Sequence, residues 1–228
     1  MLKDDGTAIR LFRRLLSPAD SKVRDSAAEA LRVAANDTEW RRNQPCDSAM
    51  AGGRIGCVLG GAVRKYSLRS DGHRQIVDLL LMGDFLGLAP TDSCFSLEAV
   101  SNGTRIASFK RDQVKALEEA QPAILEMLRD RAADAIRRLE YHLLVQGRTT
   151  AIEKVGGYLM VLCQRLPVGK DEAMVLPVSR YDIADHLGLA VETVSRTMTT
   201  LRRCGIISMA GPREVIIRQP AILAEGFA

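Results

Sequence analysis

Apolar residues recur at helical spacing in the first part of the chain, and this spacing is lost near residue 52. Residues 8–16 and 18–35 carry Ile, Leu, Val and Ala three or four positions apart, which predicts two helices. From about 45 to 110, short apolar runs alternate with Gly, Asp and Pro, as is typical of strands and tight turns. The pattern therefore predicts two helices followed by a compact β-roll or barrel.

Two dipeptides predict turns inside this β region. Asp71-Gly72 divides 63–81 into two flanks rich in β-forming residues, which predicts a hairpin closed by a two-residue turn with positive φ. Asn102-Gly103 divides 95–109 in the same way. We expect a further strand pair there.

The apolar pattern becomes helical again from residue 111. Pro122 fits the first turn of a new helix, and about 25 residues from there would form a rod of roughly 37 Å. Such a helix is longer than the core of a small domain needs, so it is either a core helix or a seam against a second copy. Small alanines beside Leu139 favour close helix–helix approach and hence a dimer. The predicted interface residues are Leu128, Ala132, Ala135, Leu139 and Leu143.

The last third of the chain shows the element order of a winged helix-turn-helix. A helix at 149–165 and a turn-rich linker precede two short helical patterns, which are followed by two β runs around Ala210-Gly211-Pro212. Between the two short helices, a small residue, a turn glycine and an apolar residue lie at offsets 0, +4 and +10, as in DNA-binding helix-turn-helix units. These residues are Ala184, Gly188 and Val194.

The second short helix carries side chains suited to reading bases. Val194, Met198 and Leu201 account for its buried side, and Ile183 of the first short helix also faces inward. The opposite side, near the helix N-terminus, carries Val191, Glu192, Ser195 and Arg196. Arginine can donate two hydrogen bonds to guanine, glutamate can accept one from cytosine, and valine can touch a thymine methyl. Glu192 and Arg196 could also be an ordinary exposed ion pair, but an acid facing DNA would repel phosphates unless it had a base partner. We therefore predict that the pair reads one G·C step, each side chain also holding the other in place.

Composition and charge exclude few functional classes. The 228 residues are 46 % hydrophobic with a net charge of +4, which suits one large or two modest domains and does not by itself indicate nucleic acid. No apolar run approaches the ~18 residues of a membrane span. The first residues include acids and no unbroken apolar stretch, unlike a signal peptide, so we expect a cytoplasmic protein.

At this point the chain resembles the CRP/FNR superfamily of bacterial transcription regulators, over about residues 10–219. "VETVSR", the preceding "DGHRQIVDLLLMGDFLG" and the long helix between them are similar to that group, and Val191 places the chain nearest the FNR/FixK branch. The resemblance implies an α+β fold with a jelly-roll-like, cyclic-nucleotide-binding-like β-roll, a long dimerisation helix and a C-terminal winged helix-turn-helix. We expect these domains at 1–110, 111–147 and 148–228.

The resemblance also implies a function. Homodimers would bind inverted repeats of the TTGA-N6-TCAA type and recruit RNA polymerase, mainly to activate genes of low-oxygen or nitrogen-oxide metabolism. It assigns Glu192, Ser195 and Arg196 to base reading and Val191 to the outer thymine. The residues that it assigns to the phosphate backbone are Ser179, Arg180, Thr193 and Arg213.

The sequence indicates the signal that the protein senses much less clearly than it indicates DNA binding. Five scattered cysteines, with no C-x-x-C pair, fit reduced thiols rather than a disulfide framework, a zinc site or an iron–sulfur cluster. The segment 83–104 keeps a Gly-Asp turn but has no arginine for a cyclic phosphate, so cAMP is not expected either.

We predict no cofactor, while haem stays open because three histidines are present. Of these, His73 is expected to be exposed, and each could equally be an ordinary surface or core residue. Cys204 follows two arginines and is a candidate redox thiol, although a small packing residue before Gly205 is the simpler interpretation. Control by the abundance of a ligand-free protein is a further option.

Two other functional classes compete with DNA binding. The C-terminal unit could belong to a small-molecule-binding module that acts through protein contacts. An enzyme is not expected, because no Ser-His-Asp set, metal-ligand cluster or phosphate-binding glycine loop is present in the sequence.

Overall fold

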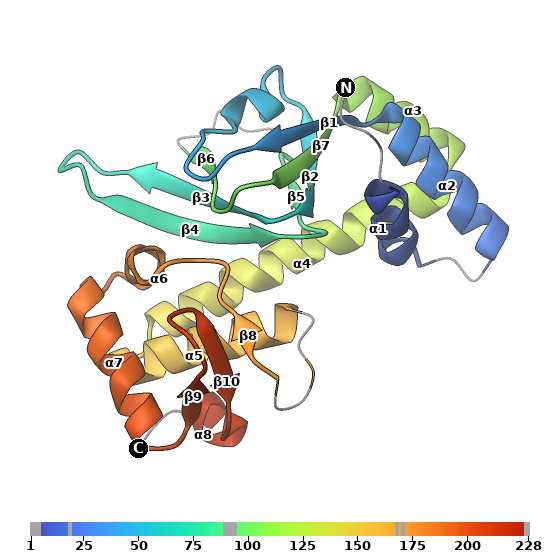
Figure 1. Cartoon of the computed structure of the whole chain (residues 1–228). Coiled ribbons are helices and arrows are strands. Elements are labelled where there is room, and N and C mark those ends of the chain that lie inside the picture. Colours follow the sequence, from blue (N-terminus) through green and yellow to red (C-terminus); the bar gives the residue numbers. More distant parts are fainter. Residues whose placement is uncertain (1–5, 18–19, 89–94, 167–168, 170–171, 226–228) are drawn as a thin grey trace. The chain divides into compact units, whose positions relative to one another are not determined.

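The computed structural model describes residues 6–17, 20–88, 95–166, 169 and 172–225 (Figure 1). Contacts divide the chain into two units. Unit 1 contains the residues up to Ser67 together with Leu79–Arg137, and unit 2 contains Leu68–Asp78 together with the residues from Arg138 onward. No helix in these described ranges is long and apolar enough to cross a membrane.

Unit 1 begins with the two predicted helices, α1 (Thr7–Leu15) and α2 (Ser21–Ala34). Asp20 ends the loop between them and caps α2, because its carboxylate accepts a hydrogen bond from the backbone N–H of Lys22 at 2.8 Å. The apolar side of α1 buries Phe12, whose ring lies 6.1 Å from that of Phe109. Both helices thus cover one face of the β-roll.

The β-roll consists of two antiparallel sheets, with strand orders β1-β7-β2-β5 and β4-β3-β6. Its elements are β1 (Asn36–Trp40), the 3₁₀ helix η1 (Asp47–Met50), β2 (Ile55–Gly60), β3 (Ala62–Leu68), β4 (Arg74–Leu81), β5 (Phe85–Leu86), β6 (Ser96–Ala99) and β7 (Thr104–Phe109). Side chains alternate along β2: Cys57 packs with the helices, while Val58 packs into the core between the sheets. The predicted β-roll is confirmed.

Three details of the predicted β region were wrong. First, β1 was not expected, since its alternating polar residues form no apolar run; it pairs with β7. Second, the loop after β3 is not a two-residue turn, because only Gly72 has positive φ and Arg69 N–H donates to His73 O across three residues. Third, β6 and β7 do not pair with each other: β6 pairs with β3, whereas β7 joins β1 and β2 in the other sheet.

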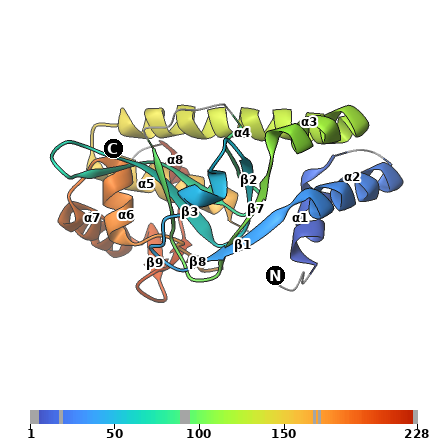
Figure 2. The ribbon, with the colours of Figure 1, turned by 90° about the horizontal axis from the view of Figure 1, so that it is seen from above.

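The helical stretch after the β-roll is confirmed. It consists of α3 (Arg111–Ala120) and α4 (Pro122–Gln146), and Pro122 is the first residue of α4, as expected. Figure 2 shows α4 as one uninterrupted helix. Leu128 lies on its covered side, only 7 % exposed, in the core that α1 and α2 share with the β-roll.

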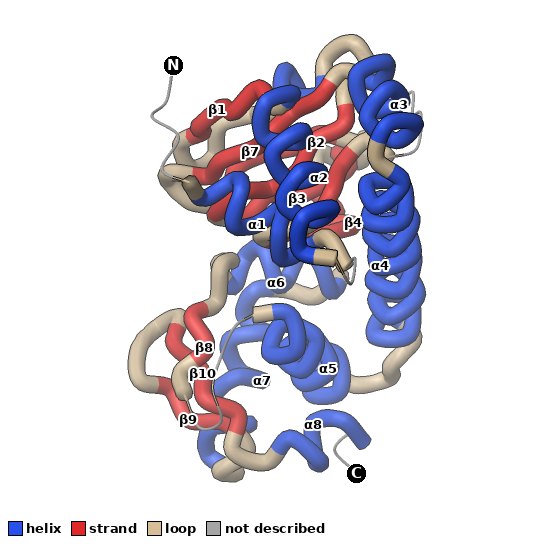
Figure 3. The backbone as a smooth tube through the Cα atoms, turned by 90° about the vertical axis from the view of Figure 1, so that its right-hand side faces the viewer, coloured by secondary structure: helices blue, strands red, loops and turns tan. Residues whose placement is uncertain are grey.

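Unit 2 contains the predicted winged helix-turn-helix (Figure 3). Its elements are α5 (Ala151–Arg165), β8 (Met174–Val175), α6 (Arg180–Leu187), α7 (Val191–Arg203), β9 (Ile207–Met209), β10 (Glu214–Ile217) and α8 (Pro220–Glu225). The β9–β10 hairpin of the wing was expected, but β8, which pairs with β10 to make a three-stranded sheet, and α8 were not. A two-residue strand inside a turn-rich linker leaves no periodic signal in the sequence.

Three aromatic rings meet in the core of unit 2. His186 of α6 is buried, with its ring centroid 4.1 Å from that of His142 and 5.1 Å from that of Tyr158. Its Nδ1 lies 3.1 Å from the carbonyl oxygen of Ile76, and since a carbonyl only accepts, Nδ1 carries the proton. Burial, followed by the neighbouring His142, lowers the pKa of His186 to about 4. Burial also lowers the pKa of His142.

This cluster predicts acid-sensitive folding. Because the folded pKa of His186 lies below its ordinary value of 6.5, the neutral ring stabilises the fold above pH 6.5, and this contribution is lost as the pH falls toward 4. We expect a loss of about 2 kcal/mol in the free energy of unfolding between about pH 7 and pH 5, measured by urea denaturation. The hydrogen bond to Ile76 O and the charge of Asp78 raise the pKa of His186 and Arg165 lowers it, but burial determines the direction.

The control variants are His186→Gln, which should flatten this pH dependence, and His73→Gln, which should not. The His73 side chain is 83 % exposed and lies far from the ring cluster in sequence. An unchanged slope in His186→Gln would contradict the assignment.

Candidate nucleic-acid interface

The corner between α6 and α7 has the predicted helix-turn-helix geometry. Gly188 ends α6 in the left-handed region, with φ 64° and ψ 40°. Leu189 N–H then donates to Ala184 O at 3.1 Å, which closes the turn. Ala184 is buried, as is Val194 on the second helix. The small residue, the turn glycine and the apolar residue therefore occupy the positions that the sequence pattern required.

Helix α7 has one buried and one exposed side. Val194, Met198 and Leu201 are buried as expected, and Thr197 joins them. On the other side Glu192 and Arg196 are exposed, while Val191 and Ser195 are half-buried. The four predicted base-reading residues therefore lie in the first two turns of α7, whose opposite side is packed against the rest of unit 2.

Glu192 and Arg196 are separate in the chain on its own, since no hydrogen bond or ion pair joins their side chains within the described residues. That each holds the other in place while they share a G·C step stays a prediction for the DNA-bound state. Both side chains end in solvent, where ordering two long side chains costs more entropy than an exposed ion pair returns. Glu192 lies in the first turn, where a carboxylate interacts favourably with the helix dipole.

The predicted phosphate-contacting residues fall into two groups. Ser179, Arg180 and Thr193 are half-buried near the starts of the two helices. Arg213, on the wing, already donates from Nε at 2.9 Å and from Nη2 at 2.6 Å to the carbonyl oxygen of Leu176, so its guanidinium also holds the wing to the segment before α6.

The N-terminus of α6 carries a capping box that the sequence analysis did not single out. Ser179 Oγ accepts from Asp182 N–H at 3.2 Å, and Asp182 Oδ2 accepts from Ser179 N–H at 3.0 Å and from Ser179 Oγ at 2.7 Å. The Asp182 side chain is only 4 % exposed, and it pairs with Arg74, which also binds Asp185. The Ser-x-x-Asp spacing could have indicated the box, but nothing local indicates the arginine, which lies 108 residues before Asp182.

Comparisons with known proteins match this geometry. Residues 153–225 fit the model of the Crp-like helix-turn-helix domain. The nitrogen fixation regulation protein FixK of Rhizobium meliloti (strain 1021) is 38 % identical over 167 residues, which cover 73 % of this chain and 74 % of the relative. The transcriptional activatory protein AadR of Rhodopseudomonas palustris is 34 % identical over 191 residues, which cover 82 % and 77 %. The chain belongs to the CRP/FNR family of transcription regulators.

A solved structure agrees with this membership. FixK2 from Bradyrhizobium japonicum superimposes with a TM-score of 0.73 at 32 % identity, covering 84 % of this chain and 96 % of FixK2. The relatives place the chain in the FNR/FixK branch, and they are regulators rather than enzymes. This CRP/FNR regulator therefore binds DNA through its winged helix-turn-helix.

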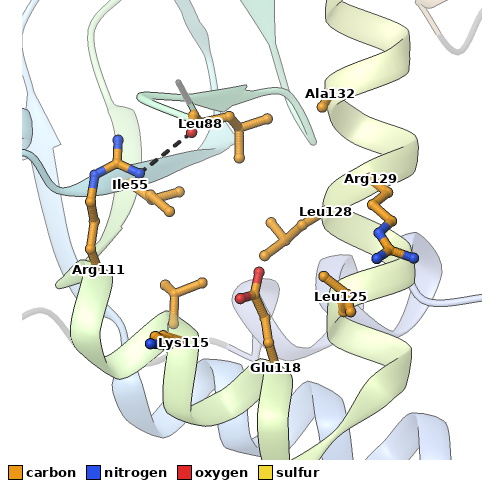
Figure 4. Close-up of a pocket in the computed structure, with 10 residues that line it drawn as sticks. Ile55, Leu88, Arg111, Lys115, Glu118, Leu125, Leu128, Arg129 and Ala132 are labelled. Carbon is orange, nitrogen blue, oxygen red and sulfur yellow. Dashed lines mark hydrogen bonds between the residues drawn. The ribbon is translucent and has the colours of Figure 1, made fainter. Parts of the chain in front are cut away.

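Unit 1 contains a cavity of about 280 Å³ (Figure 4). Glu118 of α3 points into it, next to Leu128, whereas Arg129 is directed away. Arg111 is already engaged with backbone carbonyls, donating to Gly87 O and, at 3.4 Å, to Leu88 O. The remaining lining residues are Ile55, Val114, Lys115, Leu125 and Ala132.

The residues considered for sensing do not gather into a site. In the described residues, no group of three or more His, Cys, Asp or Glu side chains is placed to bind a metal ion. Cys46 and Cys57 are buried in different cores, and burial raises both thiol pKa values, that of Cys46 to about 12. Cys163 is half-buried, Cys204 is exposed just after α7, and Cys94 lies outside the described residues.

This placement predicts unequal thiol reactivity. In a Cys94→Ser variant, Ellman's reagent at about pH 8 should modify exposed Cys204 quickly, while Cys46 and Cys57 react only as the protein unfolds, because the thiolate is the nucleophile. Replacing Cys204 by Ser in the same background should remove the fast phase of absorbance. If the fast phase persists, the assignment of the accessible thiol is wrong.

Proposed function

We propose that this regulator is a homodimeric activator that reads an inverted repeat of the TTGA-N6-TCAA type through the first turns of α7. The observation that carries the proposal is the division of α7 into a buried side at Val194, Met198 and Leu201 and an exposed side at Glu192 and Arg196. Because its opposite side is packed, α7 can present these groups to base edges in the major groove with little loss of conformational entropy on binding.

Each predicted contact follows from donor and acceptor chemistry. Arg196 donates two hydrogen bonds to guanine O6 and N7, and Glu192 accepts one from the cytosine N4 amino group. Val191 contacts a thymine methyl, and Ser195 takes part in base reading. Ser179, Arg180, Thr193 and Arg213 fix the register of the protein through phosphates, which carry no sequence information.

The dimer is supported by apolar side chains that the single chain leaves in water. On α4, Ile136 is 58 % exposed and Leu143 is 70 % exposed, with exposed Leu139 between them at helical spacing. Ala132 and Ala135 are half-buried on the same helix, but Leu128 fills the core of its own unit. A second copy of α4 would cover the exposed stripe and would place a second α7 about 34 Å away, one turn of duplex.

The regulated process is proposed from the relatives. FixK is named as a nitrogen fixation regulation protein and AadR as a transcriptional activatory protein, which supports a role in activation. That the target genes serve low-oxygen or nitrogen-oxide metabolism, and that RNA polymerase is recruited, is proposed from the family resemblance. We assign no cofactor. Haem stays an alternative: His73 is exposed, whereas buried His186 would have to become accessible before it could serve as a ligand.

Arg196→Ala tests base reading. The variant should lose roughly 1–3 kcal/mol per half-site of preference for the palindrome over a duplex whose G·C step is changed, measured by fluorescence anisotropy on both duplexes. Arg203→Ala removes the same charge from the last turn of α7 and should weaken both duplexes nearly equally. If Arg196→Ala keeps the parent's preference for the palindrome, the assigned role is refuted.

Leu139→Arg tests the dimer. A charge on the exposed stripe should leave monomers, visible in sedimentation equilibrium, and should weaken operator binding, because two half-sites can no longer be occupied together. Val33→Arg is the control, since Val33 is an even more exposed apolar residue (69 % against 45 % for Leu139) on α2, outside the stripe. An unchanged dimer mass in Leu139→Arg would place the seam elsewhere.

A further inference from the structure

An arginine from the hairpin between β3 and β4 binds the first helix of the helix-turn-helix. Arg74, the first residue of β4, donates from Nη2 to Asp182 Oδ1 at 3.0 Å. It also donates from Nε at 2.9 Å and from Nη2 at 2.7 Å to Asp185 Oδ2. One guanidinium therefore joins two carboxylates that lie three residues apart on one side of α6.

The hairpin segment is held there by several other bonds. Gln75 Nε2 donates to His186 O at 3.4 Å, and His186 Nδ1 donates to Ile76 O. Arg138 of α4 donates to Asp78 Oδ2 at 3.3 Å, and both of these side chains are largely buried. Residues 68–78, the end of β3, the loop after it and the first part of β4, thus pack as part of unit 2.

The ion pair between Arg74 and Asp182 connects Arg74 to Ser179, one of the residues predicted to contact phosphate. Arg74 holds Oδ1 of this nearly buried carboxylate, while Oδ2 accepts from both the N–H and the hydroxyl of Ser179. A buried carboxylate without a cation is costly, so the capping box at the start of α6 depends on the arginine. Ser179 and Arg180, the residues proposed to meet phosphate, are therefore positioned through Arg74.

The bond to Asp185 has an electrostatic consequence. Asp182 and Asp185 bring two negative charges to the helix that crosses the DNA backbone in helix-turn-helix complexes. With Arg74 in place the cluster carries one net negative charge instead of two, which reduces repulsion of the phosphates. Arg74 can therefore act on DNA affinity without touching DNA.

We propose that Arg74 is a positioning residue for DNA binding, which neutralises Asp185 and orients the Asp182–Ser179 capping box toward the phosphate backbone. This inference rests on the proposed function, because it requires α6 to lie against a duplex. It adds a residue from outside the helix-turn-helix to the DNA-binding machinery.

The test measures the dissociation constant of the full-length protein for the TTGA-N6-TCAA duplex at about 50 mM and about 300 mM salt. Arg74→Gln should bind about tenfold more weakly than the parent at low salt and about threefold more weakly at high salt, because salt screens the repulsion by Asp185 but does not restore the support of the capping box. Adding Asp185→Asn to Arg74→Gln should restore most of the lost affinity. A purely structural role for Arg74 would produce neither the salt dependence nor the rescue.

Arg69→Gln is the matched control. It removes the same charge from the same hairpin, but Arg69 is 68 % exposed and pairs with Asp71 rather than with α6, so its affinity should stay within about twofold of the parent's. The inference is overturned if Arg74→Gln binds like the parent, if its deficit is equal at both salt concentrations, if Asp185→Asn gives no rescue, or if Arg69→Gln shows the same loss.

Two further outcomes are also decisive. If Arg74→Gln does not fold, judged by circular dichroism, Asp185→Asn alone carries the test: it should bind about threefold more tightly than the parent at low salt and equally at high salt, and equal affinity at both overturns the inference. If the parent binds no duplex at all, the proposed function fails. If the parent binds and Arg74→Gln matches it, only the role of Arg74 fails.

Discussion

The base recognition proposed for α7 depends on the packing of its buried side. Val194, Met198 and Leu201 are buried against the rest of unit 2, and this packing fixes the direction in which the first two turns of the helix present their other side. Long polar side chains such as Glu192 and Arg196 have many rotamers in water. A fixed helix backbone reduces the conformational entropy that these side chains would lose on binding, so that contacts with bases would outweigh the loss.

The same unit contains a second constraint, which is electrostatic. Buried carboxylates and imidazoles are tolerated only when each polar atom has a partner or the charge is removed. Asp182 accepts from Ser179 and pairs with Arg74, whereas burial lowers the pKa of His186 and its ring donates to Ile76 O. Both interactions involve residues of β4, since Arg74 pairs with Asp182 and Ile76 O accepts from His186. Strand β4 therefore contributes residues to both units: Arg74 and Ile76 contact α6 within unit 2, and the last three residues of the strand, Leu79–Leu81, belong to unit 1.

Much of this fold was predictable because its signals are local. Helical spacing located α1, α2, α4 and the two helices of the motif, and Gly188 could be placed because only a left-handed turn joins α6 to α7 at that spacing. The exposed and buried sides of α7 followed from the same periodicity. Strand β1 was missed because a strand that alternates polar residues at a sheet edge looks like a loop in the sequence.

The remaining features depend on contacts between distant residues. Spacing alone offers two overlapping apolar stripes on α4, and only the packing of Leu128 into the core of unit 1, with Ile136 left exposed, separates the covered stripe from the free one. Likewise, no local pattern connects Arg74 with Asp182, since the two residues lie 108 positions apart. Pairings of this kind are set by topology, which a single sequence does not display.

The central claim, that two copies of α7 read bases one helical turn apart, is tested most directly by selecting binding sites for the full-length protein from a random duplex library. The account predicts enrichment of an inverted repeat whose half-sites contain a G·C step and are centred about 10 base pairs apart. Enrichment of no sequence, or of a single half-site without a symmetric partner, would contradict it.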